Sequence, residues 1–220
     1  MDIFKKSVRV LCLFFLIFAT LIGSFTAVAN LIFMLLCYFF RDSLRFIFRT
    51  KIKDKFLLLV TFGTLLGLAL ETVWYFGLLL ENKSQQWVSL LDDFIRMFPV
   101  YFILFVLLYQ LVKRYPFTER QAFIYGGTIG YIYYFIMEGL QINFSPLPLL
   151  ILWEINNFLL NGFLIWMPLY ISNNLVNERE RSVKKHIWVG IFLLGMVIAA
   201  IAISIIFLSV LEYKPVKLGP

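Results

Sequence analysis

The chain has 220 residues, of which 61% are hydrophobic and 15% charged, and its formal net charge is +7. Its mean hydropathy of +0.87 excludes an ordinary soluble domain and predicts an all-α, multi-pass protein of the cell membrane. There is room for about six transmembrane helices, with seven as the alternative, in one bundle that forms a single integral membrane domain over residues 1–220. The basic residues fall in short runs between apolar segments, so we expect contacts with anionic membrane lipids and no nucleic-acid binding.

The first apolar stretch, residues 8–40, is the most ambiguous part of the chain. It is long for one span and short for two. We favour one long, tilted or kinked helix, and a hairpin of two short helices is the alternative. A signal peptide cleaved after Ala29 would leave about eleven apolar residues, which are too few to cross a bilayer.

Five further apolar segments follow in the chain. They cover residues 56–80, 97–112, 122–141, 147–175 and 187–211. The charged segment 41–55 is typical of a cytoplasmic loop or an interfacial amphipathic helix. A polar loop is expected over residues 81–96, and Pro99 then lies near the start of the third span, where proline is tolerated.

The distribution of Lys and Arg predicts the orientation of these spans. Thirteen of the twenty Lys and Arg residues lie in the connections after spans one, three and five, which are therefore predicted to be cytoplasmic. With six spans both termini lie outside the cell. The basic N-terminus fits the hairpin version better, because the additional span places it in the cytoplasm. Spans two to six keep their orientation in either case.

Two of the spans share a pattern of glycines. Span two contains Gly63 and Gly67 followed by Glu71, and span four contains Gly126 and Gly130. The pattern resembles a parallel two-helix repeat, in which spans two and three correspond to spans four and five. The alternative is that each GxxxG pair only permits close packing of neighbouring helices.

Span five carries unusually polar side chains for a membrane helix. Glu154, Asn157 and Asn161 fall at i, i+3 and i+7, which places them on one face. Such a face is expected to contact protein or a water-filled cavity. With a rise of about 1.5 Å per residue, Glu71 and Glu154 lie roughly 10 to 14 Å inside the outer ends of their helices, and Glu138 lies about one turn inside its own.

These positions predict an acidic pocket in the outer half of the membrane. The candidate catalytic or ion-binding groups are Glu71, Glu138 and Glu154. The candidate substrate-binding residues are Asn157, Asn161, Tyr131, Tyr134 and Trp74. Removal from water disfavours the charged form of a carboxyl group, and protonated and ionised carboxyls side by side suit acid–base catalysis or proton coupling. The alternative is that neutral glutamates only hydrogen-bond helices together.

Metal and cofactor chemistry is not expected from this sequence. Cys12 and Cys37 belong to no CxxC motif, and His186 is the only histidine. A zinc site needs three or four nitrogen and sulfur ligands in most proteins. We therefore predict no metal site and no cofactor.

Three functions remain open at this point. The first is an intramembrane enzyme that uses the glutamates to isomerise, cyclise or hydrate a lipid or isoprenoid substrate. The second is a small proton- or cation-coupled transporter or ligand-binding membrane subunit, whose small size would suit a homo-oligomer or a membrane partner. The third is a non-catalytic assembly protein whose polar residues only hold helices together.

Overall fold

The computed structural model describes residues 24–81, 90–139, 147–176 and 183–210, together with Val10, Leu13, Phe14, Leu16, Ile17 and Thr20. Side chains are described for most of these residues, but not for residues 133–139, 147–153, 183–186 and several positions in 196–210. This part of the chain forms seven helices with defined ends, which confirms the all-α prediction. They are α2 (Phe25–Phe39), α3 (Arg41–Lys51), α4 (Lys55–Leu80), α5 (Leu90–Arg114), α6 (Glu119–Gly139), α7 (Leu147–Ile171) and α8 (Val183–Val210).

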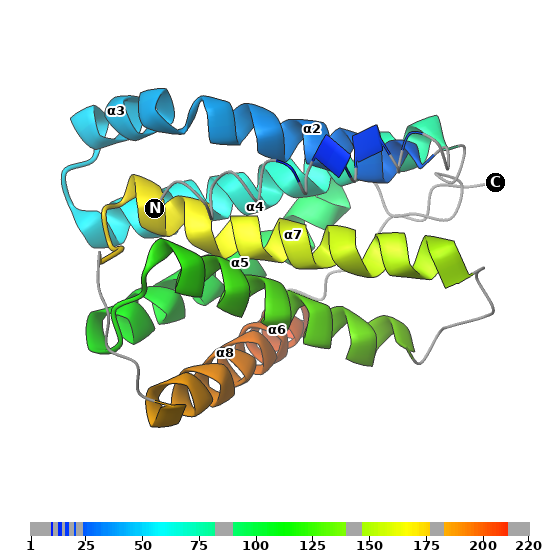
Figure 1. Ribbon diagram of the computed structural model, residues 1–220. Helices are drawn as coiled ribbons and strands as arrows, with labels where there is room; N and C mark the ends of the chain where they lie inside the picture. The colour runs from blue at the N-terminus through cyan, green and yellow to red at the C-terminus, as the bar shows by residue number, and fades with distance from the viewer. Residues whose placement is uncertain are drawn as a thin grey trace.

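Helix α7, drawn in yellow in Figure 1, lies in the middle of the bundle and contacts α2, α3, α4 and α6. Helix α5 packs against α4, and α8 crosses the bundle obliquely against α5 (Figure 1). Fully buried apolar side chains from α4, α5 and α7 fill the core, among them Leu59, Phe105 and Leu159. Within the described residues, α4 and α5 are long and apolar enough to cross a membrane.

Helix α2 begins at Phe25, in the middle of the predicted first span. The backbone of Ser24 is extended, and its side chain accepts a hydrogen bond from the amide of Ala27. The carboxylate of Glu81, just after α4, accepts a second hydrogen bond of 2.8 Å from the amide of Thr26. The end of α4 therefore caps the start of α2. The extended backbone of Ser24 excludes a continuous helix over residues 8–40, whereas the predicted kinked helix is not tested. Most residues of the alternative hairpin lie outside the described part of the chain, so the structure does not test it.

Most of segment 41–55, which was predicted to be a loop or an amphipathic helix, forms helix α3. Helix α3 has no buried residue, and it carries Arg49 and Lys51 in its last turn. Its exposed side chains include both charged residues and large apolar ones such as Phe46 and Ile47. This composition is typical of a helix that lies along a membrane surface.

Helix α5 begins at Leu90, so the predicted polar loop 81–96 was too long. Asp92 and Asp93 lie in the first turn of α5, where the helix dipole favours acidic side chains. Pro99 is consequently inside the helix and not near its start. Because proline has no N–H, it cannot donate the usual hydrogen bond to the carbonyl four residues earlier.

The remaining helix ends follow from local capping. The hydroxyl of Thr118 accepts a hydrogen bond from the amide of Gln121, and the side chain of Gln121 accepts one from the amide of Thr118. This reciprocal capping box begins α6 three residues before the predicted span. Helix α7 begins at Leu147 as predicted but ends at Ile171, because Asn173 adopts a left-handed backbone with φ of 58°.

The connections that were predicted to be cytoplasmic share one end of the bundle. Arg45 of α3 donates a 2.6 Å hydrogen bond to the side chain of Asn173, and Lys55 lies 3.4 Å from the carbonyl oxygen of that residue. The amide of Val176 donates to the carbonyl of Phe117, between α5 and α6. Helix α3, the α5–α6 connection and the end of α7 therefore lie together, as the predicted topology requires.

Candidate functional site

Two glycines let α4 approach α5 closely. A Cβ atom at Gly63 would lie 2.5 Å from the ring of Phe105, and one at Gly67 would lie 2.6 Å from the ring of Tyr101. Each aromatic ring of α5 therefore rests on the backbone of α4. The hydroxyl of Tyr101 extends from this position and donates a hydrogen bond to the carboxylate of Glu71, one turn beyond Gly67.

The carboxylate of Glu71 faces a small cavity between four helices. Asn30 of α2, Glu71 and Trp74 of α4, Tyr101 of α5 and Asn161 of α7 line it. Leucine side chains complete the wall: Leu70, Leu160 and Leu164. The cavity volume is about 40 Å³, which is room for one or two water molecules or a single small ion.

Asn30, like Tyr101, lines this cavity but was not identified from the sequence as a site residue. Its side chain is 1% exposed, and within the described residues neither its oxygen nor its nitrogen has a hydrogen-bond partner. A buried amide without partners costs free energy unless a ligand or water satisfies it. Asn30 was detectable only as an amide within the apolar stretch 8–40, because nothing in the sequence places that stretch against span two.

Asn161 is held in place by its own helix and by α6. Its side-chain nitrogen donates a 2.8 Å hydrogen bond to the carbonyl of Asn157. A Cβ atom at Gly130 of α6 would lie 2.1 Å from the side chain of Asn161. The glycines of α6 therefore serve close packing, as those of α4 do, which is what the simpler interpretation of the two GxxxG pairs predicts.

The structure brings together only part of the predicted site. Glu71, Trp74 and Asn161 line one cavity, and Glu154 is not among its lining residues. Glu154 is half-buried on α7, seven residues or about 10 Å along the helix axis from Asn161. One shared pocket for Glu71 and Glu154 is therefore not observed.

The other predicted residues have different surroundings. Asn157 is fully buried on α7, and its side-chain atoms have no hydrogen-bond partner within the described residues. Tyr131 is 39% exposed and does not line the cavity. The side chains of Tyr134 and Glu138 lie outside the described ones.

The described lining of the cavity contains one carboxylate, and its other polar groups are neutral. Within the described part of the chain, no three His, Cys, Asp or Glu side chains are grouped so that they could hold a metal ion. The cavity offers the oxygens of Glu71 and of two amides, and oxygens are the ligands that hard cations prefer. Such a site can bind a proton or one small cation.

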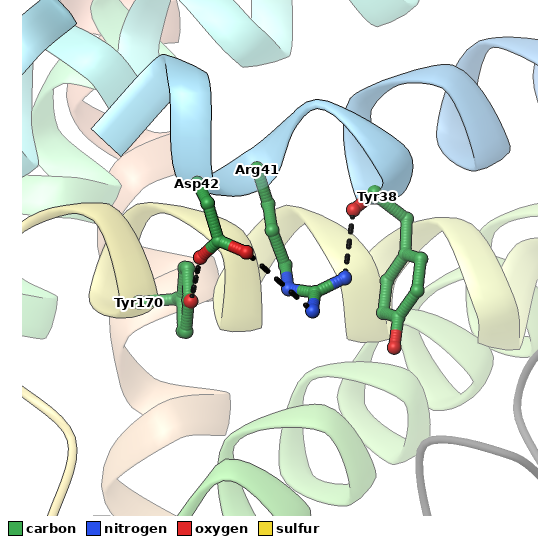
Figure 2. A network of polar contacts seen from close by, with 4 residues as sticks. All are labelled: Tyr38, Arg41, Asp42 and Tyr170. Carbon is green, nitrogen blue, oxygen red and sulfur yellow. Dashed lines mark hydrogen bonds and ion pairs between the residues drawn. The ribbon is translucent and has the colours of Figure 1, made fainter. Parts of the chain in front are cut away.

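A second polar cluster lies at the opposite end of the bundle, where α2 meets α3 (Figure 2). Arg41 donates a 3.0 Å hydrogen bond to the carbonyl of Tyr38, and its guanidinium lies 4.4 Å from the centre of the Tyr38 ring. The hydroxyl of Tyr170 on α7 donates to the carboxylate of Asp42. The Tyr170 contact joins α3 to α7 and the Arg41 contacts join α3 to α2, so we assign the cluster a structural role.

No protein-family model, no curated protein and no solved structure matches this chain. The function of the Glu71 cavity therefore has to be argued from its own geometry and chemistry.

Proposed function

We propose that the protein is a multi-pass membrane protein in which the cavity around Glu71 binds a proton or a small monovalent cation. In this proposal the protein is either a small proton- or cation-coupled transporter or a ligand-binding membrane subunit. The observation that supports it is a single carboxylate in a cavity of about 40 Å³, beside a buried amide that has no hydrogen-bond partner among the described residues. The proposal has two parts, the membrane location and the ligand.

Large apolar side chains on the outer faces of the helices support the membrane location. On α4 and α5 the exposed residues include Leu57, Leu65, Phe76 and Phe102, and on α8 they include Ile198 and Ile205. Soluble monomers rarely expose apolar patches of this extent. Lipid tails would cover these faces without any partner protein.

Five of the described helices have the length of a membrane span. Helices α4 to α8 have 21 to 28 residues, and about 20 are needed to cross the hydrocarbon core. Helix α2 has 15 residues, or about 22 Å at 1.5 Å per residue, which is short of the ~30 Å core. It would cross the membrane only together with residues before Ser24.

The charge of the cavity favours a proton or a monovalent cation as the ligand. Glu71 is the one ionisable carboxyl among the described lining residues, beside the phenol of Tyr101 and two amides. A monovalent cation or a proton would neutralise its single negative charge. A divalent cation would leave a net positive charge in a low-dielectric region, where an uncompensated charge is costly.

The test is ion flux in liposomes that contain the purified full-length protein. Sodium uptake and internal pH are followed after a sodium or a proton gradient is imposed. We expect Glu71→Gln to lower the flux at least tenfold, because the amide cannot carry the negative charge. Tyr101→Phe keeps the ring on Gly67 but removes the hydroxyl, so we expect a smaller loss.

Glu154→Gln is the matched control, because it neutralises another membrane glutamate that does not line the cavity. It should leave the flux and its ion selectivity unchanged. Wild-type flux from the Glu71→Gln variant would contradict the proposal, as would the absence of both flux and sodium binding in the wild type.

A second candidate function is acid–base chemistry on a lipid or isoprenoid. It is favoured by Trp74 and Tyr101, whose aromatic rings lie beside Glu71 and could stabilise a cationic intermediate. Mass spectrometry of organic extracts from wild type and Glu71→Gln tests this idea. An isoprenoid that the variant retains and the wild type converts would favour the enzyme, and clean extracts from both would favour ion binding.

A further inference from the structure

Helices α5 and α8 line a second, larger hollow that is partly open. It lies at the basic end of the bundle, where the Lys- and Arg-rich α3 and the α5–α6 connection meet. It has a volume of about 910 Å³, which is within the ~300–1,000 Å³ of sites that hold small molecules. We call it the α5–α8 groove. Its lining residues include Lys113, Arg114, Tyr115, Trp188, Ile191 and Phe192.

One end of the groove is positively charged. Lys113 and Arg114 form the last turn of α5, and both side chains are exposed. The guanidinium of Arg114 lies 5.6 Å from the centre of the Tyr115 ring, which limits its freedom by a cation–π contact. The described lining residues include no Asp or Glu, so this end is suited to an anionic group.

The other wall of the groove is apolar and belongs to α8. Trp188, Ile191 and Phe192 are spaced i, i+3 and i+4, so they share one face of the helix. They are 62%, 57% and 45% exposed, respectively. A ligand that covers this wall must be apolar over the length of about one helical turn or more.

We propose that the α5–α8 groove binds one anionic phospholipid, with its phosphate at Lys113 and Arg114 and an acyl chain along α8. Adjacent positive and apolar surfaces match the two parts of such a lipid. Basic pockets between membrane helices commonly bind anionic head groups. The proposal rests on the membrane location alone and does not involve Glu71, so it can hold or fail independently of ion binding.

The experiment uses quenching of tryptophan fluorescence by brominated lipids in nanodiscs. The signal of Trp188 is the difference between the wild type and Trp188→Phe. Brominated phosphatidylglycerol and brominated phosphatidylcholine are compared at equal mole fractions. Lys113 and Arg114 both attract an anionic head group, but their exposed side chains are partly screened by solvent and salt. We therefore expect about a tenfold preference of Trp188 for phosphatidylglycerol.

Double variants distinguish a specific lipid-binding site from a general effect of positive surface charge. Lys113→Ala/Arg114→Ala should abolish the preference, and Lys113→Arg/Arg114→Lys should retain it because the charge stays. The matched control is Lys51→Ala/Lys53→Ala, which removes the same charge from exposed positions at the same end of the bundle. Equal quenching by both lipids in the wild type would overturn the proposal. So would a preference that survives Lys113→Ala/Arg114→Ala, or one that the control variant loses to the same extent.

Discussion

Asn30 connects the stability of the bundle to its proposed ligand. Its amide is buried and has no hydrogen-bond partner among the described residues. We predict that Asn30→Leu raises the free energy of unfolding by about 1 kcal/mol, because an apolar side chain of similar size removes the cost of burying the amide. The same change should abolish ion binding. Thermal unfolding in detergent and flux in liposomes measure the two effects.

Asn156 provides the control for Asn30. It is also buried, at 2% exposure, and its amide likewise has no partner within the described part of the chain, but it does not line the cavity. Asn156→Leu should therefore stabilise the protein by a similar amount without loss of flux. If both variants lost flux equally, the amide of Asn30 would have no special role in the site.

The pairing of α4 with α5 depends on the absence of a side chain at Gly63. A Cβ atom there would lie 2.5 Å from the ring of Phe105, which is itself fully buried. We predict that Gly63→Ala lowers the free energy of unfolding by about 1 to 3 kcal/mol, because the ring has to leave its position. Thermal unfolding of the detergent-solubilised protein gives the difference.

Gly195 of α8 is the matched control, since a Cβ atom there would meet no atom of the described structure within 4 Å. Gly195→Ala should be neutral or stabilise the helix by up to about 1 kcal/mol through its higher helix propensity. Equal destabilisation by both substitutions would show that glycine at position 63 serves backbone flexibility and not packing.

Helical periodicity predicted those elements whose sequence pattern is continuous. It placed the start of α7 at Leu147, and it offered a loop or an amphipathic helix for segment 41–55, of which α3 is the second. It missed the first turns of α5, because the acidic residues of a first helical turn resemble those of a loop when polarity alone is considered. Asp92 is in fact buried, and its surroundings come from tertiary packing.

The candidate site was predictable only within single helices. Glu71 and Trp74 are three residues apart on α4 and so share a face, and both line the cavity. Asn30 and Tyr101 join them from α2 and α5 through the packing of whole helices, which no local spacing encodes. For the same reason, the similar depth that was predicted for Glu71 and Glu154 does not place Glu154 at the cavity.

At the scale of the whole molecule, the two proposed sites lie toward opposite ends of the bundle. Glu71 is sixteen residues beyond Lys55 on α4, or about 24 Å along the helix axis. The α5–α8 groove includes Lys113 and Arg114 at the basic end. Because basic ends of membrane bundles face the cytoplasm, we expect the groove to lie in the cytoplasmic leaflet and Glu71 nearer the outer one.

This orientation makes a prediction about which positions a reagent outside the cell can reach. In a variant with Cys12 and Cys37 replaced by serine, a cysteine at Lys83 should react with a membrane-impermeant maleimide on intact cells. Cysteines at Lys53 or Lys184 should react only after the cells are opened, because they lie in segments rich in Lys and Arg. Labelling of Lys53→Cys and Lys184→Cys but not Lys83→Cys on intact cells would invert the topology and move the Glu71 cavity to the cytoplasmic half. Labelling of all three would contradict the multi-pass arrangement itself, since the ends of α4 could then not lie on opposite sides of a membrane.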